Sequence, residues 1–310
     1  MNVLEGPRRE RRQVLVGGSP CWGTMANDQE IVLDDGRALE VDGLVHLPPC
    51  APTKIICPHL TYASRGIESR EVPQPTPTPT YFMKPVTALN AHRGTVTRPE
   101  NCRYLNYEGE FAAVIGRVTR NVTAEEAWDH IAGFVPVLDM GVHDFRDTDA
   151  GSMLRVKGAD GLCPVGPGIV AGVDPRAQRL RTYRNGEVVQ DAQIGDELIW
   201  GPDYMIADLA RHITLLPGDL ILTGTPCHSR PLNPGDELTL EISELGRLSV
   251  GIDTTPAPRA DVGHPPMDTP EARRVAFGHD VRVPEALREA YQRAGALRTP
   301  ASGENEEEGH

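Results

Sequence analysis

Short β-type runs separated by turn residues fill residues 81–254 and constrain the fold more than any other feature. The runs are FAAVIGRV, GFVPVLDM, LILTGTP, ELTLEI and LSVGI, and their composition is typical of strands. They do not alternate regularly with helices, as the strands of a doubly wound parallel sheet do. Only two stretches here look helical: one opened at Thr123 by the capping box Thr-Ala-Glu-Glu, and residues 205–212. We therefore expect a mainly β fold with a few helices, of the α+β class.

Composition divides the chain into three parts. Residues 1–52 contain IVLDDGRALEVDGLVHL, in which Asp35-Gly36 between short apolar runs predicts a β-hairpin, and hence a small N-terminal β subdomain. Residues 53–254 hold the strand-rich part and form the expected catalytic domain. Its segment PQPTPTPT predicts an extended surface connector. Residues 255–310 form a Pro-rich, acidic extension, with one helix expected over 284–297.

Charge and cysteine usage limit the partners. The net charge of -13 opposes contact with phosphate backbones, so we expect no nucleic-acid partner. No stretch approaches the roughly 18 consecutive apolar residues of a membrane span, and no apolar segment follows the basic run near the N-terminus. The six cysteines are scattered and contain no C-x-x-C pair, which suits free thiols. We expect a soluble, cytoplasmic protein with no membrane partner.

Three carboxylates in apolar surroundings are the first candidates for a site. Glu108 and Glu110 lie two residues apart in NYEGEFAAVIGRV, so on a strand both leave the same face. By itself this spacing favours two surface glutamates. Asp139 follows the uncharged run IAGFVPVL and must be paired, protonated or metal-bound, because an isolated buried carboxylate costs several kcal/mol or more. Three carboxylates without a Cys or His set favour Mg²⁺, with Mn²⁺ or Ca²⁺ possible.

Lys157 is a further candidate. It lies in the Gly-rich stretch MLRVKGADGLCPVGP, which could place it in a cleft as an oxyanion partner or a general acid/base. The alternative is a solvated loop lysine, and the sequence favours neither. Thr223-Gly224-Thr225-Pro226 ends an apolar strand in a turn whose hydroxyl and amide groups could hold a carboxylate.

An ordered set of motifs resembles the fumarylacetoacetate hydrolase superfamily. The motifs are Phe82-Met83-Lys84-Pro85, Tyr107-Glu108-Gly109-Glu110-Phe111 with Ile115-Gly116, Leu138-Asp139-Met140 with Asp144, Lys157, Asn185-Gly186-Glu187 with Gln190, Leu216-Pro217-Gly218-Asp219, and Thr223-Gly224-Thr225-Pro226. Their order and spacing cover about residues 52–254. The resemblance implies a mixed β-sandwich roll and a homodimer.

The resemblance also implies roles for individual residues. An Mg²⁺ ion would be held by Glu108, Glu110 and Asp139, and Lys157 matches the active-site lysine of the family. Gln190 and Thr225 match positions of the family that contact the substrate. Lys84 and Tyr107 match neighbours of those positions. Substrates of the family are small 2-oxo or 2-enol carboxylates that chelate the metal. The resulting stabilised enolate serves C–C hydrolysis, decarboxylation and proton shifts.

The sequence departs from the hydrolytic pattern at two places. Hydrolase and decarboxylase members carry a His and, three residues on, a Glu that together activate water. Here Arg65 stands at the His position and Glu68 retains the acid. Arginine cannot act as a base at neutral pH. His143 stands where the family commonly has an Arg, so we assign it to substrate binding.

These departures favour an isomerase or decarboxylase acting on a 2-hydroxyhepta-2,4-diene-1,7-dioate-like dicarboxylate, with Arg65 binding the distal carboxylate. One alternative is a C–C hydrolase of the acylpyruvate or fumarylacetoacetate type, using His59 or His143 with Glu68. A tailoring step on a specialised metabolite is also open. The alternative from another class is a metal-binding scaffold without catalysis.

Overall fold

The computed structural model describes residues 2–69 and 78–278. A 13-stranded, mainly antiparallel sheet forms its larger layer. Along the main path the strands are β4 (Ala38–Glu40), β3 (Glu30–Leu33), β2 (Ser19–Met25), β1 (Arg9–Val16), β15 (Gly168–Ala171), β12 (Ile131–Leu138), β11 (Gly109–Ile115), β18 (Leu220–Leu222), β6 (Ile55–Pro58) and β7 (Tyr81–Lys84). Beside this path lie β5 (Val45–Leu47), β8 (Leu89–Ala91) and β14 (Cys163–Val165).

A five-stranded sheet packs against this layer. Its strands, in order, are β17 (Glu187–Gln193), β16 (Arg179–Arg184), β19 (Glu237–Ile242), β20 (Gly246–Thr255) and β9 (Thr95–Pro99). The core between the layers includes Phe111 and Phe134, whose rings meet edge to face at 6.0 Å, and Leu240. A third, two-stranded sheet joins β10 (Leu105–Asn106) to β13 (Gly141–Val142). The expected mainly β, α+β architecture is confirmed.

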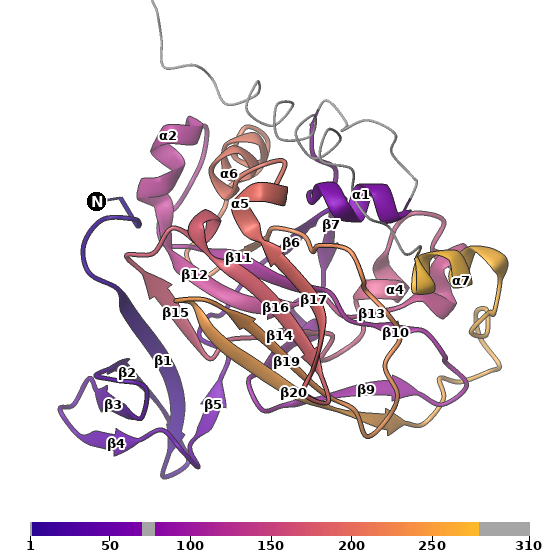
Figure 1. Ribbon diagram of the computed structural model, residues 1–310, viewed down its shortest axis with the longest axis horizontal. Coiled ribbons are helices and arrows are strands. Elements are labelled where there is room, and N and C mark those ends of the chain that lie inside the picture. Colours follow the sequence, from indigo (N-terminus) through magenta and orange to yellow (C-terminus); the bar gives the residue numbers. More distant parts are fainter. Residues whose placement is uncertain (1, 70–77, 279–310) are drawn as a thin grey trace, which may run out of the picture.

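The N-terminal strands form one corner of the molecule (Figure 1). The hairpin expected at Asp35-Gly36 is present, because β3 pairs with β4 across that turn. Val14, Ile31, Leu33 and Val41 form a small core of their own. Strand β1 also pairs with β15, so these strands extend the main sheet.

Short helices connect and cover the strands. They are α1 (Ala63–Ser69), α2 (Ala124–Ala127), α3 (Arg146–Asp149), α4 (Leu154–Lys157), α5 (Ile194–Glu197), α6 (Pro202–Ala210) and α7 (Pro270–Phe277), with 3-10 turns at Val86–Ala88, Trp128–His130, His143–Phe145 and Pro175–Ala177.

The two helices expected in the strand-rich part are present. Thr123 caps α2 through the predicted box, and its hydroxyl accepts a hydrogen bond from the Glu126 N–H at 3.2 Å. The helix expected over 205–212 begins earlier, with Pro202 in its first turn. Helices α1 and α7 were not predicted. The helix expected over 284–297 and most of PQPTPTPT lie outside the described residues.

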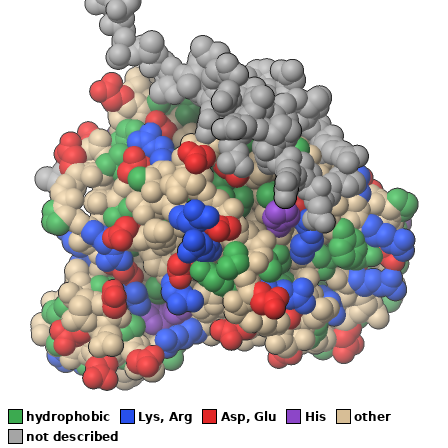
Figure 2. Space-filling view, viewed as in Figure 1, with side chains coloured by type: hydrophobic (Ala, Val, Ile, Leu, Met, Phe, Trp, Pro, Cys, Tyr) green, Lys and Arg blue, Asp and Glu red, His purple; other side chains and the backbone are tan. Residues whose placement is uncertain are grey.

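Charges of both signs are interspersed over the face shown in Figure 2. All six cysteines are free thiols. Among the described residues, no helix has the length and apolar character needed to cross a membrane.

Candidate active site

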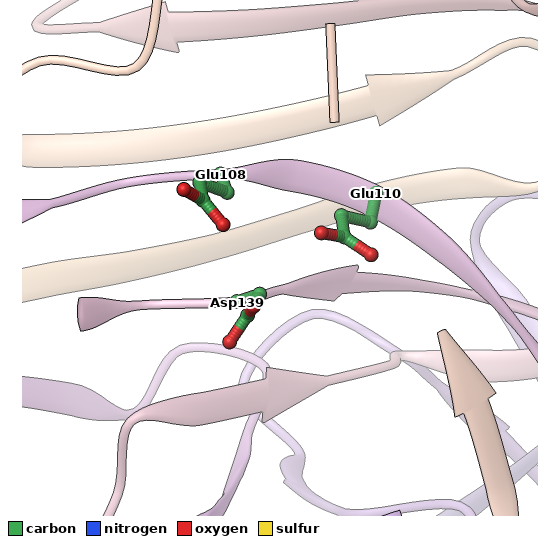
Figure 3. Close-up of side chains that lie close together, drawn as sticks. All are labelled: Glu108, Glu110 and Asp139. Atoms are coloured by element: carbon green, nitrogen blue, oxygen red, sulfur yellow. The ribbon is translucent and has the colours of Figure 1, made fainter. Parts of the chain in front are cut away.

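The three carboxylates singled out in the sequence lie together where β11 and β12 run side by side (Figure 3). Glu110 belongs to β11 and Glu108 precedes that strand, while Asp139 follows β12. The Asp139 N–H donates to the Glu108 carbonyl at 2.9 Å, which fixes the register at this point. Each residue offers one carboxylate oxygen, and these oxygens lie within 4.8 Å of one another. All three residues are buried, which excludes the reading of the glutamates as surface residues.

Two lysines neutralise part of this charge. The Lys157 ammonium, in the last turn of α4, lies 2.6 Å from Glu108 Oε2 and 3.0 Å from Asp139 Oδ2. The Lys84 ammonium, at the end of β7, donates to Asp139 Oδ1 at 2.5 Å and to the Met140 carbonyl at 3.0 Å. Both side chains are buried, although the whole chain has only three lysines. Lys157 is therefore not the solvated loop lysine of the alternative reading.

The electrostatics keep Lys157 charged. Burial opposes its charge, but Asp139 and Glu108 outweigh that effect and raise the pKa of the ammonium above its ordinary value. Gly141 provides the room for this arrangement, because a Cβ there would lie 3.0 Å from Lys157 Cδ. Lys157 can thus donate hydrogen bonds and a proton to an anion but is not poised as a base.

Glu110 differs from the other two carboxylates. Among the described residues, its carboxylate accepts one hydrogen bond, from the Gly224 N–H at 2.6 Å, and no ion pair to it is found. Burial, together with the charges of Asp139 and Glu108, raises its pKa well above the ordinary value. Three clustered carboxylates, one of which forms no ion pair within the described part of the chain, are an oxygen-only donor set that fits a hard divalent cation.

Arg65 and Glu68 face this cluster from α1. Arg65 Nη1 donates to Glu68 Oε2 at 2.6 Å, and Nη2 donates to Glu108 Oε1 at 3.3 Å. Glu68 is fully buried and accepts further bonds from Arg230 Nη1, at 2.6 Å, and from the His228 N–H, at 3.1 Å to each oxygen. Both oxygens of Glu68 are therefore already occupied by charged and backbone donors.

A cavity opens over the carboxylates, and its wall includes Arg65, Lys157 and Thr225 as well as the two histidines weighed above. His143 is fully buried, and neither ring nitrogen has a hydrogen-bond partner within the described part of the chain. Burial, with Lys157 and Arg146 nearby, lowers the pKa of His143 well below its usual value. Burial, with the same two cations, also lowers the pKa of His59. Both rings are therefore neutral near pH 7.

Two predicted substrate-binding residues, Gln190 and Tyr107, form hydrogen bonds that hold the loop after β18 in place. The Gln190 amide nitrogen donates to Thr225 Oγ1 at 3.0 Å and to two carbonyls of the same loop, and its oxygen accepts from the Gly109 N–H at 3.1 Å. Gln190 thus ties the loop around Thr225 to β11. The Tyr107 hydroxyl donates to the His228 carbonyl at 2.8 Å. Neither residue is part of the cavity wall described above. Their contact with substrate stays a prediction.

Sequence reasoning missed other parts of the wall. Arg146 comes from α3, while Arg274, Val275 and Gly278 come from α7 and the residue after it. Arg230, which binds Glu68, was also missed. Nothing in the local sequence marks these residues, because each acquires its place only through contacts with segments far away in the chain.

Comparison with known proteins agrees with the motif pattern. Residues 54–252 match the fumarylacetoacetate (FAA) hydrolase C-terminal family. The chain belongs to this family. Enzymes of the family are typically dependent on a divalent metal, and the acidic cluster at Glu108, Glu110 and Asp139 is of the matching kind.

Relatives with isomerase names are prominent. The chain is 40% identical over 192 residues to the 4-hydroxyphenylacetate degradation bifunctional isomerase/decarboxylase of Salmonella dublin, a match spanning 61% of this chain and 44% of that protein. The 5-carboxymethyl-2-hydroxymuconate delta-isomerase structure from Mycobacterium smegmatis superposes with a TM-score of 0.73 at 28% identity, covering 79% of this chain and 99% of that one. A 2-hydroxyhepta-2,4-diene-1,7-dioate isomerase from Mycobacterium marinum gives 0.71 at 29% identity, covering 79% and 98%.

Proposed function

We propose that this protein isomerises or decarboxylates a hydroxydienedioate-type dicarboxylate, whose 2-oxo or 2-enol carboxylate end binds at Glu108, Glu110 and Asp139. The names of the relatives support a dicarboxylate of this kind. The oxygen-only donor set supports Mg²⁺, with Mn²⁺ and Ca²⁺ as the ions to compare. When bound, such a cation supplies the positive charge that stabilises an enolate.

The chain's own residues contribute charge and position. Lys157 remains an ammonium because Asp139 and Glu108 hold it in that form, and we assign it the stabilisation or protonation of the anion formed from the substrate. Lys84 orients Asp139 through its bond at 2.5 Å. Arg65 lies on the cavity wall, and we assign it the second carboxylate of the substrate, which a planar guanidinium binds well.

The observation that carries the proposal is the state of Glu68. A carboxylate that activates water needs an oxygen free to accept the proton of that water. Here Arg65, Arg230 and the His228 N–H occupy both oxygens. With anion-stabilising cations present and both oxygens of Glu68 occupied, water activation by Glu68 is disfavoured, whereas loss of carbon dioxide or a proton shift does not require water activated by that residue.

A substrate panel tests the proposal. Hydroxydienedioates, acylpyruvates and oxaloacetate would each be incubated with the protein and Mg²⁺, and followed by ultraviolet absorbance and product mass. We expect turnover of a dicarboxylate, with a product of unchanged mass or one lighter by carbon dioxide. Cleavage of an acylpyruvate into two acids with uptake of water would contradict it.

One observation favours a second candidate, the C–C hydrolase. His59 and His143 are neutral and line the cavity, so either could accept a proton from water. The substrate panel described above distinguishes this hydrolase from the isomerase or decarboxylase. Turnover of any 2-oxo acid excludes the non-catalytic scaffold.

We also propose that the protein is a homodimer and that it is cytoplasmic. Sedimentation analysis would test the first and cell fractionation the second.

A further inference from the structure

Helix α7 lies outside the region shared with the family, which ends at residue 252, and yet it forms part of the active-site wall. Figure 1 shows it at the same end of the molecule as α1 and α4, which carry Arg65 and Lys157. The helix therefore lies beyond the stretch matched to the family and still reaches the site described above.

The helix is held firmly in place. The Thr269 side chain caps its first turn by accepting from the Ala272 N–H at 3.0 Å. Asn106 Nδ2 donates to the Ala276 carbonyl at 2.8 Å, and Ala272 and Ala276 are buried against Tyr104. These contacts fix α7 on the segment that leads into β11 and the metal-binding carboxylates.

From this position α7 contacts the end of α1. Arg274 Nη1 donates to the carbonyl of Ser69, the last residue of α1, at 2.6 Å. Glu271 holds the same guanidinium with bonds of 2.9 and 2.8 Å. Gly278 lies so close to Glu68 that a Cβ there would meet Oε1 at 2.6 Å. The last residue of α1, Ser69, and the Glu68 side chain therefore both contact the segment formed by α7 and Gly278.

We propose that Arg274 is a positioning residue: through Ser69 it fixes α1, so that Arg65, paired with Glu68, is presented to the substrate in one orientation. This inference rests on the proposed function for its claim that Arg65 binds substrate. Carbonyls at a helix C-terminus lack partners within the helix, and the guanidinium supplies one that also bears the charge preferred there. The extension thereby sets how tightly the family site binds a dicarboxylate.

The test compares Arg274→Ala with Arg274→Lys and with a matched control, Arg273→Ala. Arg273 is the neighbouring residue on α7, pairs with Asp268, has a side chain that is 58% exposed and is not part of the cavity wall described above. Its removal perturbs the same helix without touching α1. Lysine at 274 keeps a donor for the Ser69 carbonyl.

Two measurements are made on each full-length variant with Mg²⁺. Amide hydrogen exchange within α1 should be faster in Arg274→Ala than in wild type, unchanged in Arg273→Ala and intermediate in Arg274→Lys. The KM for the dicarboxylate should rise roughly tenfold in Arg274→Ala, the size of one charge-assisted bond, with kcat changed by less than about threefold.

Unchanged exchange in Arg274→Ala would overturn the coupling of α7 to α1. Faster exchange with an unchanged KM, or a loss of kcat alone, would overturn the positioning role. If wild type turns over an acylpyruvate and no dicarboxylate, the proposed function fails, but the exchange comparison and the KM for that acylpyruvate still decide the role of Arg274.

Discussion

Replacing Lys157 with methionine keeps the length of the side chain but removes its ammonium from between Glu108 and Asp139. In the structure this ammonium makes two charged contacts, of 2.6 and 3.0 Å. Breaking a buried ion pair by removing one partner costs about 3–5 kcal/mol. We expect the lower end of that range, about 3 kcal/mol, because Lys84 still neutralises Asp139. Turnover should fall by about 100-fold or more if the ammonium stabilises or protonates the reacting anion.

The response to Mg²⁺ distinguishes this prediction from a general loss of stability. The variant removes one of the positive charges beside Glu108 and Asp139, so saturating Mg²⁺ should stabilise it more than it stabilises wild type. Chemical denaturation with and without Mg²⁺ measures this difference. The control is Lys54→Met, because Lys54 pairs with buried Asp219 at 2.7 Å but is not part of the cavity wall described above. It should lose some stability, gain no extra response to Mg²⁺ and keep its turnover. A change in turnover under about threefold in Lys157→Met would refute the assignment of this residue to catalysis.

Three further changes test other parts of the molecule. Asp139→Asn should abolish Mg²⁺-dependent turnover in a protein that remains folded by circular dichroism; full activity, or activity indifferent to a chelator, would contradict the metal site. Arg65→Ala should weaken binding of dicarboxylates by about 1.5–3 kcal/mol, far more than binding of monocarboxylate analogues. Equal losses for both kinds of ligand would contradict the role of Arg65 in binding the distal carboxylate. Hydrolysis gained in Arg65→His would favour the hydrolase. Burial, with Arg12 and Arg93 nearby, lowers the pKa of His46 to about 4, so the unfolded chain gains a proton below about pH 6.5 that the folded chain refuses. Wild type should therefore lose stability between about pH 7 and pH 5, and His46→Phe should lose about 2 kcal/mol less in urea titrations; identical losses would refute this.

The acidic cluster could be predicted because its signal is local. Glu108 and Glu110 are two residues apart at the start of β11, a strand that is buried along its whole length, and Asp139 directly follows β12, an apolar strand that pairs with β11. Such a pattern leaves few ways to accommodate charge. The sequence also marked Lys157 as a candidate but left its burial open. Its place depends on α4 folding back against β13, a contact that no periodicity encodes.

Helix α1 and the state of Glu68 could not be predicted in this way. The segment ASRGIES has seven residues and carries no acidic residue in its first turn and no basic residue in its last, so it lacks the signals that reveal short helices. Two of the residues that occupy Glu68, His228 and Arg230, lie about 160 positions further along the chain. Motif matching found the acid at Glu68, but only its tertiary partners indicate that it is not a free base.

The position of α7 has a consequence for substrate assignment by similarity. The family match over residues 54–252 includes the three clustered carboxylates and Lys157, to which the proposed function assigns the part of the substrate common to the family. In the proposed function the distal part binds Arg65, and the helix that carries Arg65 is contacted at Ser69 by Arg274, more than 200 residues further along the chain. A contact of this kind can change which substrate fits without altering any motif. Relatives that share the motifs therefore predict the chemistry at the metal better than the identity of the distal group, and the substrate follows from kinetics on variants of α1 and α7.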